Sequence, residues 1–345
     1  MRTFALALLL AAACTSCVGG PGAATLPRSA APALGGQSAP SSATGSPVVP
    51  PAARGSPPPS TSPRPADLSP ARPADVSPAR PADVSPARPA DVGSLRVELF
   101  DAHIHYSQDA WSLYSPEQAI EILRDAGIRR ALVSSTPDSG TQRLYAIAPD
   151  LIVPILRPYR TRDDIGPWTR DPTVVAYVES TYRRGIHRGI GEFHIVPGDA
   201  ATPVMRAIVA MAIREDLWLH AHADEHAIVE LARSDRRAKV LWAHSGLSST
   251  PEAVRAVLET NPNVVAELAL RGDVMWSQVI DPAWRDVLVR YPDRFMVGTD
   301  TWTPSRWEDV VAGHERTRAW LRQLPPDVAG RIASGNAERL FGEPR

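Results

Sequence analysis

Short apolar runs of strand length alternate with amphipathic, helix-length windows along the chain from about Leu95 onward. The runs carry few polar residues, which is typical of strands that are buried on both faces of a parallel sheet. Strands are expected at residues 95–100, 131–135, 151–156, 186–193, 217–222, 240–244, 264–270 and 295–299. Helices are expected between them, among others at residues 115–127, 173–182, 203–214, 225–233, 251–259 and 283–289. A doubly wound sheet gives a similar alternation, but a count of eight strands favours an α/β fold of the (β/α)8 TIM-barrel type.

The first 94 residues lack this alternation. Eighteen of the 35 prolines precede Val92, mixed with Gly, Ala and Ser, and from Arg64 the segment repeats RPAD(L/V)SPA with a period of eight. Such a segment buries too little apolar surface to offset the entropy of ordering it, and two prolines per unit favour an extended spacer. We expect residues 18–94 to be a disordered Pro/Ala-rich linker in front of one domain, residues 95–345.

The chain begins MRTFALALLLAAACTSC, a basic residue followed by an apolar stretch of about ten residues. That stretch is too short to span a bilayer as a helix, and it predicts an export signal at residues 1–17. The small residues before Cys14 resemble a bacterial lipoprotein box, in which Cys14 is lipidated, with Cys17 as the competing site. We therefore expect an exported protein that is lipid-anchored in a bacterial cell envelope. An ordinary signal peptide with incidental cysteines is the alternative.

Composition narrows the chemistry of the domain. Cys14 and Cys17 are the only cysteines, so the domain has neither a disulfide nor a thiolate ligand. The formal net charge is −1, and no basic block lies outside the linker, which argues against a nucleic-acid partner. The expected partners are a small-molecule substrate and, through the lipid anchor, a membrane.

Side chains that bind metals follow several of the expected strands. In a parallel barrel the C-terminal ends of the strands meet at one face, so side chains at these ends converge. Imidazoles and carboxylates crowded there need a cation between them. In chain order the candidate ligands are His103, His105, Glu192, His220, His222, His244 and Asp300.

Nitrogen and oxygen donors without thiolate suit Zn, and also Mn, Fe, Ni or Co. Four groups hold one ion, whereas His244 and a bridging Glu192 make room for a second. On the fifth strand either His220 or His222 can be the ligand, and His222 is preferred because it lies nearer the end of the strand.

These motifs together resemble the amidohydrolase superfamily of metal-dependent TIM-barrel hydrolases, specifically its amidohydrolase-related branch. The resemblance is carried by DAHIH at residues 101–105, GTD at 298–300, the histidines of the fifth and sixth strands, and a tail, RIASGNAERLFG, like the terminal helix that closes such barrels. It implies that His103 and His105 bind one ion, and that the later histidines bind the same or a second ion. It also implies that Asp300 both touches metal and handles protons. Glu192 stands where many two-metal members carry a carboxylated lysine, which resembles the members that bridge with glutamate.

The expected activity is hydrolysis of a small-molecule C–N or C–O bond, or of a P–O bond, by metal-activated water. Asp300 would accept the proton of that water, while His244 would bind metal or contact a substrate oxygen. The alternatives are a decarboxylase of the same superfamily, a phosphoesterase of another barrel type, and a non-catalytic envelope lipoprotein.

Substrate residues are expected on loops at the same face. Arg157 and Tyr159 follow the third strand and Arg271 follows the seventh, where guanidinium groups suit a carboxylate or phosphate; surface salt bridging is the alternative. Among the remaining histidines, His194 is expected to be structural or to belong to the site.

Overall fold

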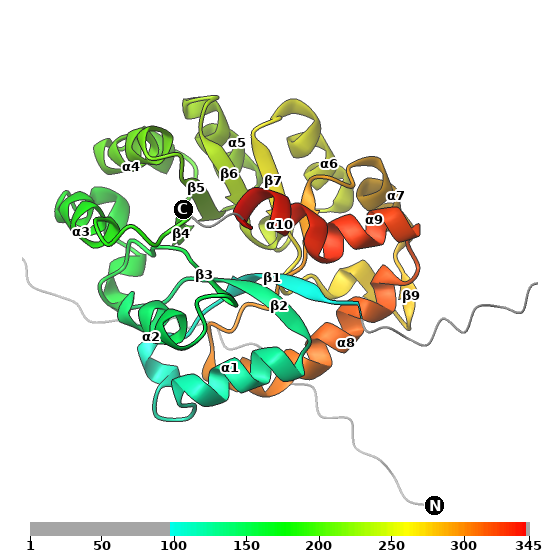
Figure 1. Cartoon of the computed structure of the whole chain (residues 1–345). Coiled ribbons are helices and arrows are strands. Elements are labelled where there is room, and N and C mark those ends of the chain that lie inside the picture. The colour runs from blue at the N-terminus through cyan, green and yellow to red at the C-terminus, as the bar shows by residue number, and fades with distance from the viewer. Residues whose placement is uncertain (1–96, 343–345) are drawn as a thin grey trace, which may run out of the picture. The chain divides into compact units, whose positions relative to one another are not determined.

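The computed structural model describes residues 97–342, which form a barrel of parallel strands surrounded by helices (Figure 1). The predicted signal peptide at residues 1–17, the linker at 18–94 and the lipidation sites Cys14 and Cys17 lie outside the described residues. Within residues 97–342, none of the helices is both long and apolar enough to cross a membrane.

The barrel strands form two parallel arcs. One arc has the order β1-β2-β3, and the other has the order β10-β7-β6-β5-β4. Isolated parallel bridges join the arcs at two seams, Leu156 with Ile190 and Asp101 with Val297. The predicted α/β barrel is therefore confirmed. The barrel strands are β1 Leu99–Ile104, β2 Ile128–Val133, β3 Ile152–Pro154, β4 Gly189–His194, β5 Trp218–His222, β6 Lys239–Trp242, β7 Val264–Glu267 and β10 Phe295–Met296.

A helix follows each barrel strand, and the sequence determines where several of them begin. Ser115, Thr202 and Thr250 each accept a hydrogen bond from a backbone N–H of the first turn, and a proline follows each cap. The helices are α1 Pro116–Asp125, α2 Ser139–Ile147, α3 Thr173–Tyr182, α4 Pro203–Arg214, α5 Glu225–Ser234, α6 Pro251–Thr260, α7 Pro282–Arg290, α8 Val310–Leu321, α9 Pro326–Gly330 and α10 Asn336–Phe341.

Shorter elements connect these helices and strands. An antiparallel hairpin, β8 Met275–Trp276 with β9 Val279–Ile280, is inserted between β7 and α7. The short helical segments are η1 Gln108–Ala110, η2 Arg162–Ile165, η3 Trp168–Arg170, η4 Asp199–Ala201, η5 Ala243–Gly246, η6 Gly272–Val274, η7 Pro304–Asp309 and η8 Arg331–Gly335.

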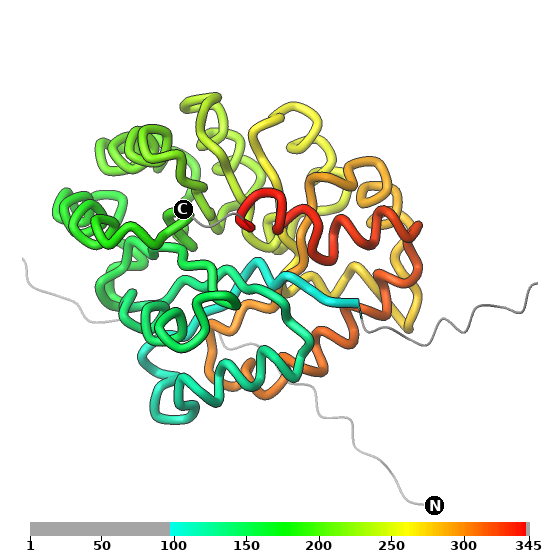
Figure 2. The backbone as a smooth tube through the Cα atoms, in the orientation of Figure 1, coloured from blue at the N-terminus to red at the C-terminus, as the bar shows by residue number. Residues whose placement is uncertain are grey.

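The core has two layers. The larger layer lies between the strands and the helices, and the smaller fills the barrel with inward-facing residues such as Trp218 and Met296. The terminal helix α10 closes this inner layer, because the ring of Phe341 lies 6.5 Å from Phe100 and 5.3 Å from Trp218. Figure 2 shows the red terminal helix beside the cyan first strand. The tail therefore does what the family resemblance implied.

Most strand boundaries differ from the prediction by a few residues, and two of these differences affect the site. The first strand was expected at residues 95–100, but β1 runs from Leu99 to Ile104, because Ala102 donates to the carbonyl of Val297, just after β10, and Ile104 pairs with β2. The seventh was expected at 264–270, but β7 ends at Glu267, and Leu270 has a φ of 60° that no strand accommodates. His103 therefore lies inside a strand rather than after it.

Candidate metal centre

The polar side chains predicted at the strand ends converge at one end of the barrel. The structure brings together all the residues that the sequence predicts as ligands and adds Glu267, the last residue of β7. All of them are buried except His222, whose side chain is 30% exposed. Potential ligand atoms within 4.8 Å of one another come from the groups His103–His105–Glu192, His103–His244–Asp300, His103–His220–Glu267 and Glu192–His194–His222.

Three histidines of the centre are held through Nδ1. The Nδ1 of His105 lies 2.5 Å from the carbonyl oxygen of Ser134, and that of His244 lies 3.1 Å from the carbonyl oxygen of Ala269. A carbonyl only accepts, so in both rings Nδ1 carries the proton and donates. The Nδ1 of His103 faces the Glu267 carboxylate at 2.9 Å in the same way. Bonds of this kind fix the orientation and tautomer of metal-binding histidines in proteins.

The opposite nitrogens of His103 and His105 lie close together, beside carboxylates. When each ring is neutral with Nδ1 donating, its Nε2 is an acceptor, and Nε2 of His103 lies 3.0 Å from Nε2 of His105. Oε2 of Glu192 lies 3.4 Å and 3.2 Å from the same two nitrogens, and Oδ1 of Asp300 lies 3.4 Å from Nε2 of His105. A buried cluster made only of acceptors is unfavourable unless a cation lies among them. The donor set fits a divalent metal that prefers nitrogen and oxygen.

Glu192 faces two sets of nitrogens. Its Oε2 lies toward His103 and His105, whereas its Oε1 lies 2.9 Å from Nδ1 of His222 and 3.4 Å from Nε2 of His244. A carboxylate between two nitrogen sets has the arrangement of a bridging ligand.

The two histidines of β5 lie at different depths. His222 contacts Glu192 at the end of the strand, whereas Nε2 of His220 lies 4.0 Å from Glu267 and has no hydrogen-bond partner among residues 97–342. His222 is thus the partner of Glu192, and the preference for His222 over His220 as the metal ligand stays a prediction.

Charge in the centre follows from the same contacts. Burial alone lowers the pKa of His103, but the carboxylates of Glu192 and Glu267 outweigh burial and raise that pKa well above its usual value. Burial alone raises the pKa of Glu192 and of Glu267, but His103 outweighs it and holds both well below the usual value. The carboxylates of Glu192 and Glu267 therefore stay ionised and favour positive charge in the centre.

Arg271 supports the turn that carries His244. In that turn His244 and Ser245 have φ values of 56° and 46°. Nη1 of Arg271 donates to the carbonyl of Ser245 (3.1 Å) and Nη2 to that of Ser249 (2.8 Å), while Asp273 accepts from Nε and Nη2. The substrate role of Arg271 stays a prediction. The geometry argues against it, because the guanidinium already donates hydrogen bonds to Ser245, Ser249 and Asp273.

Arg157 and Tyr159 also contact protein groups. Arg157 is fully buried, and its Nη2 donates to Oε2 of Glu192 at 2.8 Å while its guanidinium stacks 4.2 Å from the ring of Trp302. Tyr159 is fully buried as well, and its hydroxyl contacts His194. Arg157 therefore contacts Glu192 through Nε and Nη2, with Nη1 left unpartnered within residues 97–342, and Tyr159 contacts His194, so the predicted contact of both with substrate stays a prediction.

Asp300 is oriented by two neighbours. Its Oδ1 accepts from the backbone N–H of Trp302 at 3.0 Å, and its Oδ2 accepts from Nη1 of Arg306 at 2.6 Å. Arg306 belongs to η7, and its side chain is 36% exposed. The sequence did not indicate Arg306, because it lies six residues beyond Asp300 in a loop without periodicity.

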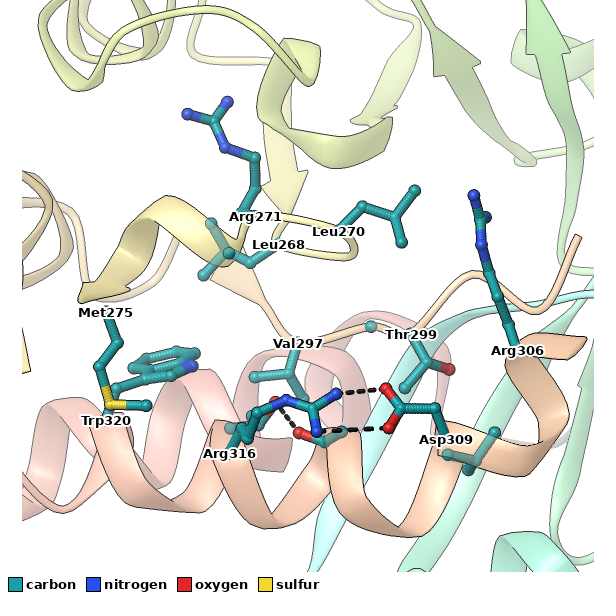
Figure 3. A pocket seen from close by; sticks show the side chains of 15 residues that line it. Leu268, Leu270, Arg271, Met275, Val297, Thr299, Arg306, Asp309, Arg316 and Trp320 are labelled. Carbon is teal, nitrogen blue, oxygen red and sulfur yellow. Dashed lines mark hydrogen bonds and ion pairs between the residues drawn. The ribbon is translucent and has the colours of Figure 1, made fainter. Parts of the chain in front are cut away.

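A cavity of about 420 Å3 lies between α8 and the loop after β7. Figure 3 shows Leu268 and Leu270 on one side, the ion pair of Arg316 with Asp309 on the other, and Arg306 at one end. The cavity therefore borders the centre through the ion pair of Arg306 with Asp300.

Strict alternation of side chains along DAHIH would place Asp101 on the same side as its two histidines, but the structure places it elsewhere. Its carboxylate accepts from Oγ1 of Thr299 (2.6 Å) and contacts Nε2 of His314 (2.9 Å), away from the cluster. The pairing of β1 with β2 is irregular between Asp101 and Ile104, so the strict alternation of side chains is lost there.

The chain is similar to known proteins in sequence and in structure. The sequence profile of a family described as amidohydrolase matches residues 174–342. YJJV, a TatD homologue of Escherichia coli K12, has 15% identity and a TM-score of 0.51, over 72% of this chain and 99% of that one. A putative 2-pyrone-4,6-dicarboxylic acid hydrolase of Pseudomonas putida has 15% identity and a TM-score of 0.50, over 72% and 98%. No curated protein matches the chain. At such identities the structural likeness shows the fold.

Proposed function

Because the chain belongs to the amidohydrolase family of metal-dependent hydrolases, we propose that it hydrolyses a C–N or C–O bond of a small molecule with two divalent ions, most simply Zn. The observation that carries this proposal is the convergence of Nε2 of His103 and Nε2 of His105, 3.0 Å apart, beside the carboxylates of Glu192 and Asp300. A resident cation removes the repulsion between these acceptors.

Two ions are supported by the placement of Glu192. One oxygen of this carboxylate faces His103 and His105, and the other faces His222 and His244, so each oxygen serves its own set of nitrogens. His103, His105 and Asp300 would hold the first ion, and His222 and His244 the second.

Bound divalent ions polarise a carbonyl group and lower the pKa of water to about 7. Asp300 then accepts the proton of the attacking water, because the backbone N–H of Trp302 and the guanidinium of Arg306 hold its carboxylate toward His105. Arg157 keeps Glu192 in place through its Nη2 and Nε donors. His244 stays in position because its turn is braced by Arg271.

We also propose that the chain is exported and lipid-anchored in a bacterial cell envelope through Cys14 or Cys17. The support comes from the sequence of residues 1–17 and from the Pro-rich linker, which would hold the hydrolase away from a membrane surface. Metabolic labelling with a fatty acid in a bacterial host tests this. If each single variant, C14S and C17S, keeps the label but the double variant loses it, then either cysteine can be lipidated. An unlabelled wild-type chain would refute the lipid anchor.

Elemental analysis of the purified full chain tests the hydrolase proposal. We expect about two equivalents of transition metal per chain, falling to about one or none in H103A/H105A. A metal-free chain that stays metal-free after incubation with Zn, Mn, Fe, Ni and Co would refute the metal centre. One equivalent in the wild type would refute the second ion alone.

A further inference from the structure

His194 lies at the mouth of the centre and is not one of the residues proposed above to hold the two ions. It is two residues beyond Glu192 on β4 and pairs in register with His222 of β5. Its ring stacks on that of His222, with the centroids 4.4 Å apart and the planes at 26°. His194 is partly exposed, whereas Glu192 is buried. It can therefore be reached by a molecule that approaches the ions from solvent.

The Tyr159 hydroxyl decides which nitrogen of His194 carries the proton. The hydroxyl oxygen accepts from the backbone N–H of His194 at 2.7 Å and lies 3.2 Å from Nδ1. Tyr159 is fully buried, so its own proton needs an acceptor, and among residues 97–342 the Nδ1 of His194 is the one that contacts it. When the hydroxyl donates to Nδ1, the neutral ring carries its proton on Nε2.

A proton on Nε2 of His194 would give the mouth of the centre a hydrogen-bond donor, whereas Glu192 and Asp300 are acceptors. Nε2 of His194 has no hydrogen-bond partner within residues 97–342. Two nearby guanidinium groups are turned toward carboxylates: Arg157 donates to Glu192 through Nε and Nη2, which leaves its buried Nη1 without a partner within residues 97–342, and Arg306 donates to Asp300. A neutral N–H beside the ions can bind an oxygen that gains negative charge during the reaction.

We propose that His194 is a catalytic residue that donates a hydrogen bond from Nε2–H to the carbonyl oxygen of an amide or ester substrate, and that Tyr159 is the positioning residue that fixes this tautomer. The proposal rests on the hydrolase function and narrows its substrate class to acyl compounds.

A competing role for His194 is that of a further metal ligand, since it shares a group with Glu192 and His222. Coordination through Nε2 needs a lone pair there, and hence the proton on Nδ1. That tautomer would leave the buried Tyr159 proton without an acceptor. The two roles therefore differ in a measurable property, the nitrogen that carries the proton.

Long-range 1H–15N NMR of the full chain, labelled in histidine and loaded with zinc, tests the proposal directly. We expect His194 to be protonated on Nε2, and Y159F to shift the ring toward a mixture of tautomers. H194Q assigns the resonance, and H226Q, which alters an exposed histidine of α5, serves as the matched control. A wild-type His194 protonated on Nδ1, or coordinated through Nε2, would overturn the proposal.

Turnover of 4-nitrophenyl acetate by the same zinc-loaded proteins is the second arm. H194L should lower kcat by on the order of 100-fold, while H194Q, which keeps an N–H donor, retains more activity than H194L. Thermal unfolding midpoints and zinc content, measured on the same samples, should match the wild type. Loss of zinc in H194L identifies a ligand and contradicts the proposal, as does equal kcat in H194L and wild type. A wild-type chain without zinc refutes the proposed function instead, and the NMR tautomer still decides the role of His194.

Discussion

The Nδ1 of His103 lies 2.9 Å from Oε1 of Glu267, a fully buried carboxylate 164 residues away in the chain. Glu267 also accepts from the backbone N–H groups of His244 (2.6 Å) and Ala269 (2.5 Å). One side chain thus orients one proposed ligand and anchors the backbone of another. Partners of this kind typically change metal affinity by 10-fold to 100-fold when they are removed.

We therefore expect E267A to weaken metal binding by roughly 10-fold to 100-fold. Competition with a chromophoric chelator measures the dissociation constant of zinc. E259A, which removes an exposed carboxylate of α6, should leave that constant unchanged. Equal affinities for E267A and the wild type would show that His103 is held without Glu267.

Arg306 is expected to act on Asp300 rather than on the metal. R306Q should retain the metal content of the wild type and lower kcat by about 10-fold or more, because the carboxylate of a general base must be oriented toward its water. R316Q is the matched control, since Arg316 lies on α8 at the same cavity and pairs with Asp309 (Figure 3). A loss of metal in R306Q would place Arg306 among the groups that build the ion site.

Arg271 should prove structural. R271L leaves the carbonyls of Ser245 and Ser249 without their donor, and we expect a loss of about 2 to 4 kcal/mol of unfolding free energy. The second ion should bind more weakly as well, because the His244 turn is loosened. Urea unfolding and elemental analysis measure the two effects. A variant of full stability that has lost only substrate affinity would restore the substrate role predicted from the sequence.

The pair of Asp101 with His314 is expected to stabilise the barrel without taking part in chemistry. Both side chains are fully buried and their atoms lie 2.9 Å apart, so H314A leaves a buried carboxylate without this partner and should cost about 3 to 5 kcal/mol. R331A, which removes an exposed ion pair with Asp293, should cost less than about 1 kcal/mol. Urea unfolding compares them, and similar losses in the two variants would contradict this account.

The strand pattern alone predicted that His103, His105, Glu192 and Asp300 lie together. The C-terminal ends of parallel barrel strands meet at one face regardless of the conformation of the loops. The same rule could have found Glu267, which follows the apolar run VVA directly. It was missed because a single glutamate in a strand assumed to continue to residue 270 carries little signal.

Side-chain partners in loops were harder to predict. Asp101 faces Thr299 and His314 because the pairing of β1 with β2 is irregular there. The residues of DAHIH do not indicate this irregularity. Arg271 and Tyr159 were expected to face substrate, yet their donors find carbonyls and a histidine that are distant in sequence. The pattern of apolar residues in a strand predicts the face of the sheet on which a side chain lies. The hydrogen-bond partner of that side chain depends on how segments distant in sequence pack together.

An ion in the centre would also stabilise the barrel at the two seams between its arcs. Each seam is joined by an isolated bridge, and the proposed ligands come from both arcs: His103 from one, and Glu192 and Asp300 from the other. A cation held by these residues would cross-link the arcs at the mouth, where the sheet is least continuous. Its removal should therefore speed amide exchange at Ala102 and Leu156, which bond across the seams, before exchange rises inside either arc.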